Sequence, residues 1–238
     1  MSDGFKKYAV YWMPKHTDPL AQFGASWTGW CAETGESRSR GVFGDLSVEI
    51  PKITRHIRLH GLHGVIKAPF RLGACCSPLS LEHTLGPLVE DSVSFQLPRL
   101  RLAVVGGCVA LIPSQGSPEI SDLADRIGKA LAPLDAAVPA NSVAEPEPEV
   151  VVPVHPSEPD GVPTVDPAIE FPTTVDDRFH MPLTDPIGPE LALEVIEKLL
   201  PALQPILRQP RQLSDLALMG DPSEGRPLRL QRRYDMRD

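Results

Sequence analysis

Two histidines open short apolar runs in otherwise unrelated parts of the chain. His63 begins the run His-Gly-Val-Ile-Lys, and His180 begins the run His-Met-Pro-Leu-Thr. Alternate side chains of a β-strand share a face, so we expect Lys67 on the face of His63 and Thr184 on the face of His180. Two such strands side by side would bring both imidazoles into one cleft, where they can divide the roles of acid and base on a phosphodiester. On spacing alone, two unrelated histidines on half-buried strands are the simpler interpretation.

The strands and helices that must position these histidines alternate along the chain. Strands are expected over residues 7–13, 62–72, 95–102, 104–112, 213–219 and 228–234, and helices over residues 18–29, 78–91, 117–132 and 189–207. Apolar residues recur at helical spacing, as at Leu20, Phe23 and Trp27, and Pro201 and Pro205 are expected to kink or break the last helix. This order predicts an α+β fold with two similar lobes, each an antiparallel sheet with helices on one face, and with histidine strands lining a central cleft.

Residues 139–172 differ in composition from the rest, because they hold nine of the 27 prolines, many acidic residues and no Lys or Arg. Such a segment is expected to stay extended and solvated. We therefore assign residues 1–138 to an N-terminal lobe with the first histidine, residues 139–175 to a flexible linker, and residues 176–238 to a C-terminal lobe segment with the second histidine. Within the first lobe, Gly106-Gly107 is expected to bend the strand over 104–112 or to let a ligand approach.

Composition and charge exclude several classes of protein. The hydrophobic content is 42%, and the four cysteines show no Cys-x-x-Cys spacing, which indicates reduced thiols rather than a disulfide framework. The first residues lack the apolar core of a signal peptide, and no run approaches the roughly 20 apolar residues of a membrane span. A net charge of −8 argues against a general nucleic-acid-binding surface. We expect a cytoplasmic protein without membrane or nucleic-acid partners, and its oligomeric state is not determined by the sequence.

Local basic segments are exceptions to this acidic balance. Residues 52–60 lead into the first histidine run, and they either focus a phosphate-bearing ligand or form a solvated turn. Residues 226–234 alternate basic and apolar residues as an edge strand does, so their arginines are expected to guard that edge, although one could reach a phosphate. His56, His60 and His63 have a spacing that a helix could present to a metal, but a zinc site needs three or four ligands on a defined scaffold. We expect no metal and no cofactor.

Four blocks, in order along the chain, resemble those of a bacterial family. Residues 8–11 read Tyr-Ala-Val-Tyr, residues 61–72 read Gly-Leu-His-Gly-Val-Ile-Lys-Ala-Pro-Phe-Arg-Leu, residues 106–113 read Gly-Gly-Cys-Val-Ala-Leu-Ile-Pro, and residues 178–184 read Arg-Phe-His-Met-Pro-Leu-Thr. Together they resemble the phosphonate metabolism proteins of the two-histidine phosphoesterase superfamily. The resemblance implies a metal-independent phosphodiesterase or cyclic phosphodiesterase. It also implies that His63 and His180 are catalytic and that Lys67 and Thr184 bind the phosphate of a small phosphorylated ligand.

The chain departs from the family motif, His-x-Thr, at both histidines. Val65 and Pro182 stand where the family has threonines whose hydroxyls would donate to the phosphate. Losing one preorganised donor costs on the order of 100- to 1,000-fold in rate, so losing two could leave little catalysis. A rival function is therefore a non-catalytic module on the same fold that binds a phosphate ligand or a partner. The missing threonines favour this module, whereas the retained His63, His180 and Lys67 favour the enzyme.

Overall fold

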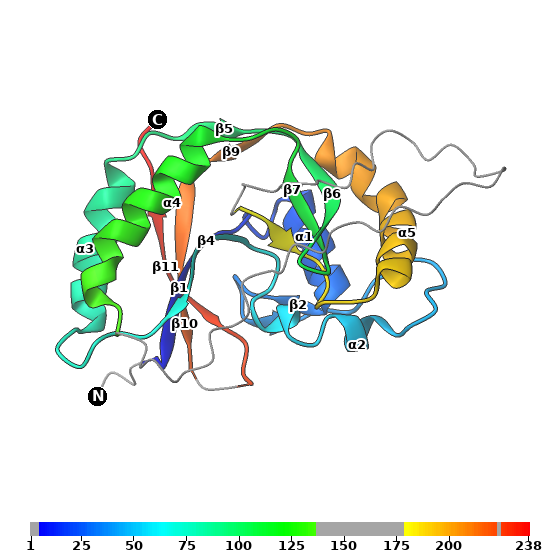
Figure 1. Cartoon of the computed structure of the whole chain (residues 1–238), viewed down its shortest axis with the longest axis horizontal. Helices are drawn as coiled ribbons and strands as arrows, with labels where there is room; N and C mark the ends of the chain where they lie inside the picture. The colour runs from blue at the N-terminus through cyan, green and yellow to red at the C-terminus, as the bar shows by residue number, and fades with distance from the viewer. Residues whose placement is uncertain (1–4, 137–178, 223–224) are drawn as a thin grey trace.

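The computed structural model describes residues 5–136, 179–222 and 225–238, which form an α+β fold (Figure 1). The strands are β1 (Lys7–Trp12), β2 (Trp30–Cys31), β3 (Glu36–Ser37), β4 (Gly64–Phe70), β5 (Phe95–Leu97), β6 (Leu100–Val105), β7 (Cys108–Pro113), β8 (Met181–Pro182), β9 (Arg211–Leu213), β10 (Asp215–Asp221) and β11 (Arg229–Asp235). The helices are α1 (Pro19–Thr28), α2 (Ile50–Ile53), α3 (Pro78–Glu90), α4 (Pro118–Leu131) and α5 (Pro189–Leu207), with the 3₁₀ turns η1 (Ile57–Leu59) and η2 (Ala132–Leu134).

The first lobe is a four-stranded antiparallel sheet in the order β11-β10-β1-β4. Helix α3 contacts β11 and α4 contacts β4, so both helices cover the same face. Alternation along β1 explains the two faces: Tyr8, Val10 and Trp12 join the main core, whereas Ala9 and Tyr11 join a smaller apolar cluster on the other face. That second face is free of α3 and α4 and forms one wall of the candidate site.

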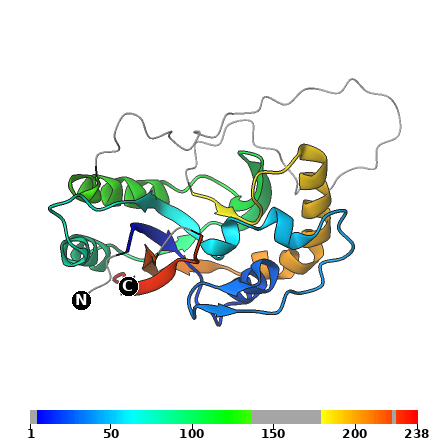
Figure 2. The same ribbon diagram turned by 90° about the horizontal axis from the view of Figure 1, so that it is seen from below.

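The second lobe is a three-stranded sheet in the order β6-β7-β8, packed against α5, which in turn contacts α1. In both views α3 and α4 lie at one end of the molecule and α5 at the other (Figures 1 and 2). A short ladder between β5 and β9 runs from one lobe to the other. Each lobe takes segments from both sides of residues 137–178, which lie outside the described residues. The predicted linker over 139–175 lies wholly within that range, so the division at that segment stays a prediction.

The glycine pair at 106 and 107 differs from its predicted place inside a strand. Gly106 and Gly107 have φ of 55° and 77° and form the two-residue turn between β6 and β7. Two positive φ angles in succession are the requirement of the tight hairpin turn whose twist matches that of the strands. The prediction of one bent strand over 104–112 is therefore wrong, and these residues form a hairpin.

Of the predicted kink or break in the last helix, the break does not occur, because α5 continues to Leu207 through Pro201 and Pro205. Prolines four residues apart lie on one side of a helix, and both are exposed, so water can reach the carbonyls that lose a partner. The opposite side buries Leu199 and Leu203 and holds the helix together through packing. In the part of the chain that the structure describes, no helix is both long and apolar enough to cross a membrane.

Candidate active site

The first histidine segment makes a sharp turn just before β4. η1 ends at Leu59, and Gly61 follows with φ of 69°, a left-handed conformation that favours glycine. A Cβ on Gly61 would lie 2.6 Å from the Ala32 side chain, so the turn also packs closely on the residue after β2. This geometry places the carbonyl of Gly61 within reach of the His63 ring two residues later.

The protonation state of His63 follows from its contacts. Its Nδ1 lies 2.8 Å from the carbonyl oxygen of Gly61. A carbonyl can only accept, so Nδ1 carries the proton and donates it, which leaves Nε2 with a free lone pair. His63 is only 4% exposed, and this burial, together with the neighbouring His60 and His180, lowers its pKa to about 3 against the opposing effect of the Gly61 bond. The imidazole is therefore neutral at neutral pH, with its unprotonated nitrogen at Nε2.

Tyr11 and His60 surround this imidazole, and sequence analysis missed both as site residues. The Tyr11 ring lies 4.1 Å from the His63 ring, and the His60 ring lies 5.3 Å from it at an interplanar angle of 26°. The Tyr11 hydroxyl and His60 Nδ1 are 2.8 Å apart. Tyr11 reaches the cluster because β1 pairs Tyr11 with Val65 on β4. From the sequence, His60 is the last residue of the basic segment 52–60 and a member of the weak metal pattern with His56 and His63.

The structure separates the three histidines of that weak metal pattern. His56 turns to Asp185, whose Oδ2 lies 3.2 Å from His56 Nδ1, whereas His60 and His63 stack together. Over the described ranges, no group of three or more His, Cys, Asp or Glu side chains is arranged to hold a metal ion.

The second histidine segment lies directly against the first. The backbone N–H of Val65 donates to the carbonyl of His180 at 3.4 Å, and His180 lowers the pKa of His63 as one of several causes. The ring of Phe179 packs over Gly64, where a Cβ would lie only 2.3 Å from it. The two predicted catalytic residues therefore lie on adjoining segments, with His180 half-buried and His63 buried.

The residues after His180 are anchored to the rest of the second lobe. Phe179, Met181 and Leu183 are buried while His180 and Pro182 are half-buried, as alternation predicts. Pro182 lies on β8, the edge strand of its sheet, where proline is tolerated.

Thr184 ends this alternation, because it is fully buried and its Oγ1 accepts a 2.9 Å hydrogen bond from the N–H of Val109. Contact between Thr184 and a phosphate, expected from the sequence, would require this packing to open. The next residue, Asp185, accepts hydrogen bonds from the backbone N–H groups of His56 and Ile57, at 3.0 Å each. Asp185 thus ties the second histidine segment to the turn that carries the first.

Lys67, the other predicted phosphate ligand, has partners of its own. Its Nζ lies 3.3 Å from a carboxylate oxygen of Asp135 and 4.8 Å from the centre of the Phe70 ring. The pairing of β1 with β4 shifts in register between Val10 and Tyr11, and this irregularity lies between the levels of Lys67 and Val65. A phosphate at Lys67 would have to compete with the Asp135 carboxylate.

Comparison with known proteins identifies a family. The chain matches the model of a family described as a protein of unknown function (DUF1045) over residues 65–155 and 172–229, and it therefore belongs to that family. The matched segments include Lys67 and His180, and His63 lies just before the first of them. Over 72 residues the chain is 33% identical to ribose 1,5-bisphosphate phosphokinase PhnN of Janthinobacterium sp. (strain Marseille), a match that covers 30% of this chain and only 16% of that relative.

Among solved structures, the chain is similar to E. coli LigT complexed with 3'-AMP, with a TM-score of 0.44 and 12% identity over 98% of this chain and 99% of that one. It is also similar to a phosphoesterase, with a TM-score of 0.42 and 11% identity over 98% and 99% of the two chains. At this distance neither similarity assigns a function or a ligand to the chain.

Proposed function

We propose that this protein is a two-histidine phosphodiesterase that acts on a small phosphodiester or cyclic phosphate, with His63 and His180 transferring protons. The observation that carries the proposal is the state of His63. Its Nδ1–H is held by the Gly61 carbonyl at 2.8 Å, so Nε2 is an unprotonated base in a buried position beside the segment of His180. A general base needs an unprotonated nitrogen, and the fixed Nδ1–H tautomer provides one at Nε2.

In the proposed reaction, Nε2 of His63 takes a proton from a water or hydroxyl as its oxygen forms a bond to phosphorus. The bond from phosphorus to the leaving oxygen breaks, and the imidazolium of His180 gives that oxygen a proton. A bound phosphate anion favours the charged imidazolium, so it would raise the pKa of His63 from about 3 toward neutrality. His180 is half-buried, which leaves it a route to exchange protons with solvent.

Other residues have supporting roles in this proposal. Tyr11 holds His60 through the 2.8 Å contact, and both rings pack on His63 and fix its orientation. Lys67 binds the phosphate after the ligand displaces Asp135 from its ammonium group. Thr184 acts through its bond to Val109, by holding the backbone that carries His180, and its expected direct contact with phosphate stays a prediction.

The biological setting is proposed from sequence likeness. The resemblance to phosphonate metabolism proteins supports a role in phosphonate use in the cytoplasm, without a metal ion or cofactor. The partial match to a ribose 1,5-bisphosphate phosphokinase supports a small phosphorylated sugar as the type of ligand.

A second candidate function is a binding module that has lost turnover. Val65 and Pro182 have no hydroxyl to donate to a phosphate, and the Thr184 hydroxyl is buried and bonded to β7. Without these donors, the developing negative charge of a phosphoryl transition state lacks stabilisation that is typically worth on the order of 100- to 1,000-fold in rate for each donor. Ligand affinity could then persist where turnover does not.

The test is an assay of the purified protein, with EDTA present, against cyclic and linear phosphodiesters. We expect turnover in the wild type, its loss in a His63→Ala/His180→Ala variant, and its retention in His83→Ala, which changes an exposed histidine on α3. No turnover in the wild type, together with turnover in a Val65→Thr/Pro182→Thr variant, would overturn the enzyme and support the binding module.

A further inference from the structure

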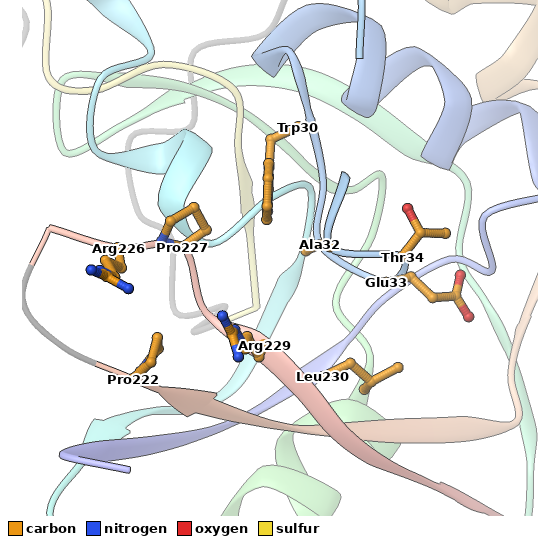
Figure 3. A pocket seen from close by; sticks show the side chains of 10 residues that line it. Trp30, Ala32, Glu33, Thr34, Pro222, Arg226, Pro227, Arg229 and Leu230 are labelled. Atoms are coloured by element: carbon orange, nitrogen blue, oxygen red, sulfur yellow. The ribbon is translucent and has the colours of Figure 1, made fainter. Parts of the chain in front are cut away.

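A pocket of about 380 Å³ lies between the β2–β3 hairpin, Pro222 and residues 226–230. Its lining includes Trp30, Ala32, Thr34, Arg226, Arg229 and Leu230. Figure 3 shows the Trp30 ring on one side of this space and the guanidinium groups of Arg226 and Arg229 on the other. The pocket thus combines an aromatic wall with two positive charges.

Arg226 and Arg229 are the basic residues of the pocket lining. Within the described part of the chain, neither Arg226 nor Arg229 forms an ion pair, and both are exposed. Two later arginines of the same segment differ, because Arg232 pairs with Glu82 at 3.4 Å and Arg233 with Asp215 at 2.6 Å. The segment therefore contains arginines that are paired with acids and arginines that remain available to a ligand.

Glu33, the acidic residue of the pocket lining, is already engaged. Its Oε1 lies 3.1 Å from Nε of Arg233, and its Oε2 lies 3.3 Å from Nδ1 of His16. The carboxylate of Glu33 is thus turned to partners outside the pair Arg226 and Arg229, and the pocket keeps a net positive character.

Residues of the pocket are in direct contact with the turn that carries His60 and His63. The N–H of Leu228, between the two arginines in sequence, donates to the carbonyl of Leu59 at 2.7 Å, one residue before His60. Ala32 lines the pocket and packs against Gly61, whose carbonyl holds His63. Leu228 also belongs to the same apolar cluster as Tyr11. These contacts place the pocket on the same side of the first lobe as Tyr11 and the turn that carries His60 and His63.

We infer that this pocket binds a second phosphate group of the ligand whose phosphodiester lies at His63 and His180, an inference that rests on the proposed function. Arginine forks bind phosphate oxygens in pairs, and two of them around one space suit a dianionic group better than a neutral one. The ring of Trp30 offers the body of the ligand an apolar surface. The substrate class is then a small compound with a phosphodiester at one end and a phosphate monoester at the other.

The test compares two substrates that differ only in the second phosphate. One is a nucleoside cyclic monophosphate with a free primary hydroxyl, and the other is the same compound phosphorylated at that hydroxyl. Arg226→Gln/Arg229→Gln should raise KM for the phosphorylated compound by roughly 10-fold or more, because charge-assisted hydrogen bonds are lost. It should leave the kinetics of the unphosphorylated compound unchanged. Arg208→Gln/Arg232→Gln, with the same change in net charge away from the pocket, should alter neither substrate.

Equal effects of the double substitution on both substrates, or no effect on either, would overturn the inference. If the wild type turns over neither compound, the proposed catalysis fails and the pocket is tested separately by calorimetry with inorganic pyrophosphate. Binding heat that is lost in Arg226→Gln/Arg229→Gln and kept in Arg208→Gln/Arg232→Gln and in His63→Ala would still support the pocket. Absence of binding to the wild type, or equal binding by all variants, would reject it.

Discussion

The two histidine segments hold their imidazoles in different ways. At His63 the ring itself is fixed: it is buried, bonded to Gly61 through Nδ1, and packed by Tyr11 and His60. At His180 the following backbone is fixed instead, through Thr184 and its bond to Val109, while the imidazole remains half-buried. A ring held neutral in one tautomer suits a base, and a ring that can exchange protons with solvent suits an acid. We therefore propose unlike roles for the histidines of two similar motifs, His63 as the base and His180 as the acid.

The largest expected effect is the loss of turnover on replacing either histidine, and its pH dependence separates the base from the acid. His63→Asn and His180→Asn should each lower kcat by at least about 100-fold, the usual value of a general acid or base. The pH profile of kcat/KM distinguishes them, because a base must be unprotonated and an acid protonated. His63→Asn should remove the acid limb of the profile, and His180→Asn should remove the alkaline limb. In the free wild type the acid limb lies well below pH 6.5, because burial lowers the pKa of His63 to about 3. Loss of the same limb in both variants would contradict the assignment.

The next effect concerns stability in acid. The pKa of His63 is about 3 when folded and 6.5 as an ordinary histidine, so the unfolded chain binds more protons between these values. The contribution of His63 is fully present above pH 6.5 and is lost as the pH falls toward 3, with a slope of at most about 1.4 kcal/mol per pH unit. Urea unfolding at a series of pH values should show a shallower fall for His63→Asn than for the wild type. His83→Asn, on exposed α3 surface, should keep the wild-type slope.

Contact between the two segments can be broken at Gly64, where a Cβ would lie 2.3 Å from the Phe179 ring. Gly64→Ala should cost about 1–3 kcal/mol in the free energy of unfolding, because the ring must move and its neighbours are tightly packed. It should also lower turnover, since Phe179 precedes His180. Gly128→Ala on α4 is the control, with nothing within 4 Å of its Cβ, and it should be neutral or stabilising. Thermal or urea unfolding that ranks the two variants equally would show that Phe179 moves freely.

Sequence reasoning reached the α+β fold because its elements have strong local signals. The apolar spacing of Leu20, Phe23 and Trp27 marks α1, and all three side chains are buried. The hairpin turn at 106 and 107 was missed although a Gly-Gly pair between two apolar runs is itself a local signal for a two-residue hairpin, and the structure shows positive φ at both positions. Helices and strands with a clear apolar periodicity were thus predictable from the sequence, and the turns that connect them were less so.

The candidate site was less predictable than the fold, since it depends on contacts between distant residues. Tyr11 and His60 are 49 residues apart, and they meet only through the register of β1 against β4 and the turn at Gly61. Alternation correctly describes the burial from Phe179 to Leu183, but it fails at Thr184, where a tertiary hydrogen bond to Val109 determines the side-chain position. The roles of His63, His180, Lys67 and Thr184 stay predictions for the experiments above.

The smallest expected effect concerns the contact between Tyr11 and His60 that packs on the ring of His63. Tyr11→Phe removes the hydroxyl that lies 2.8 Å from His60 Nδ1, and it should cost about 1 kcal/mol, the net value of one hydrogen bond. Tyr8→Phe is a matched control on the same strand: its hydroxyl is buried on the opposite face and has no hydrogen-bond partner of good geometry among the described residues, so its loss should be neutral or stabilising.

The turnover of the same variant tests the role of His60. If His60 only positions His63, Tyr11→Phe should lower kcat by less than about 10-fold. The Tyr11→Phe variant should keep the acid limb of the pH profile, since His63 remains the base. A loss as large as that of His63→Asn would instead make Tyr11 and His60 part of the proton pathway, and the first segment would then act as a three-residue unit.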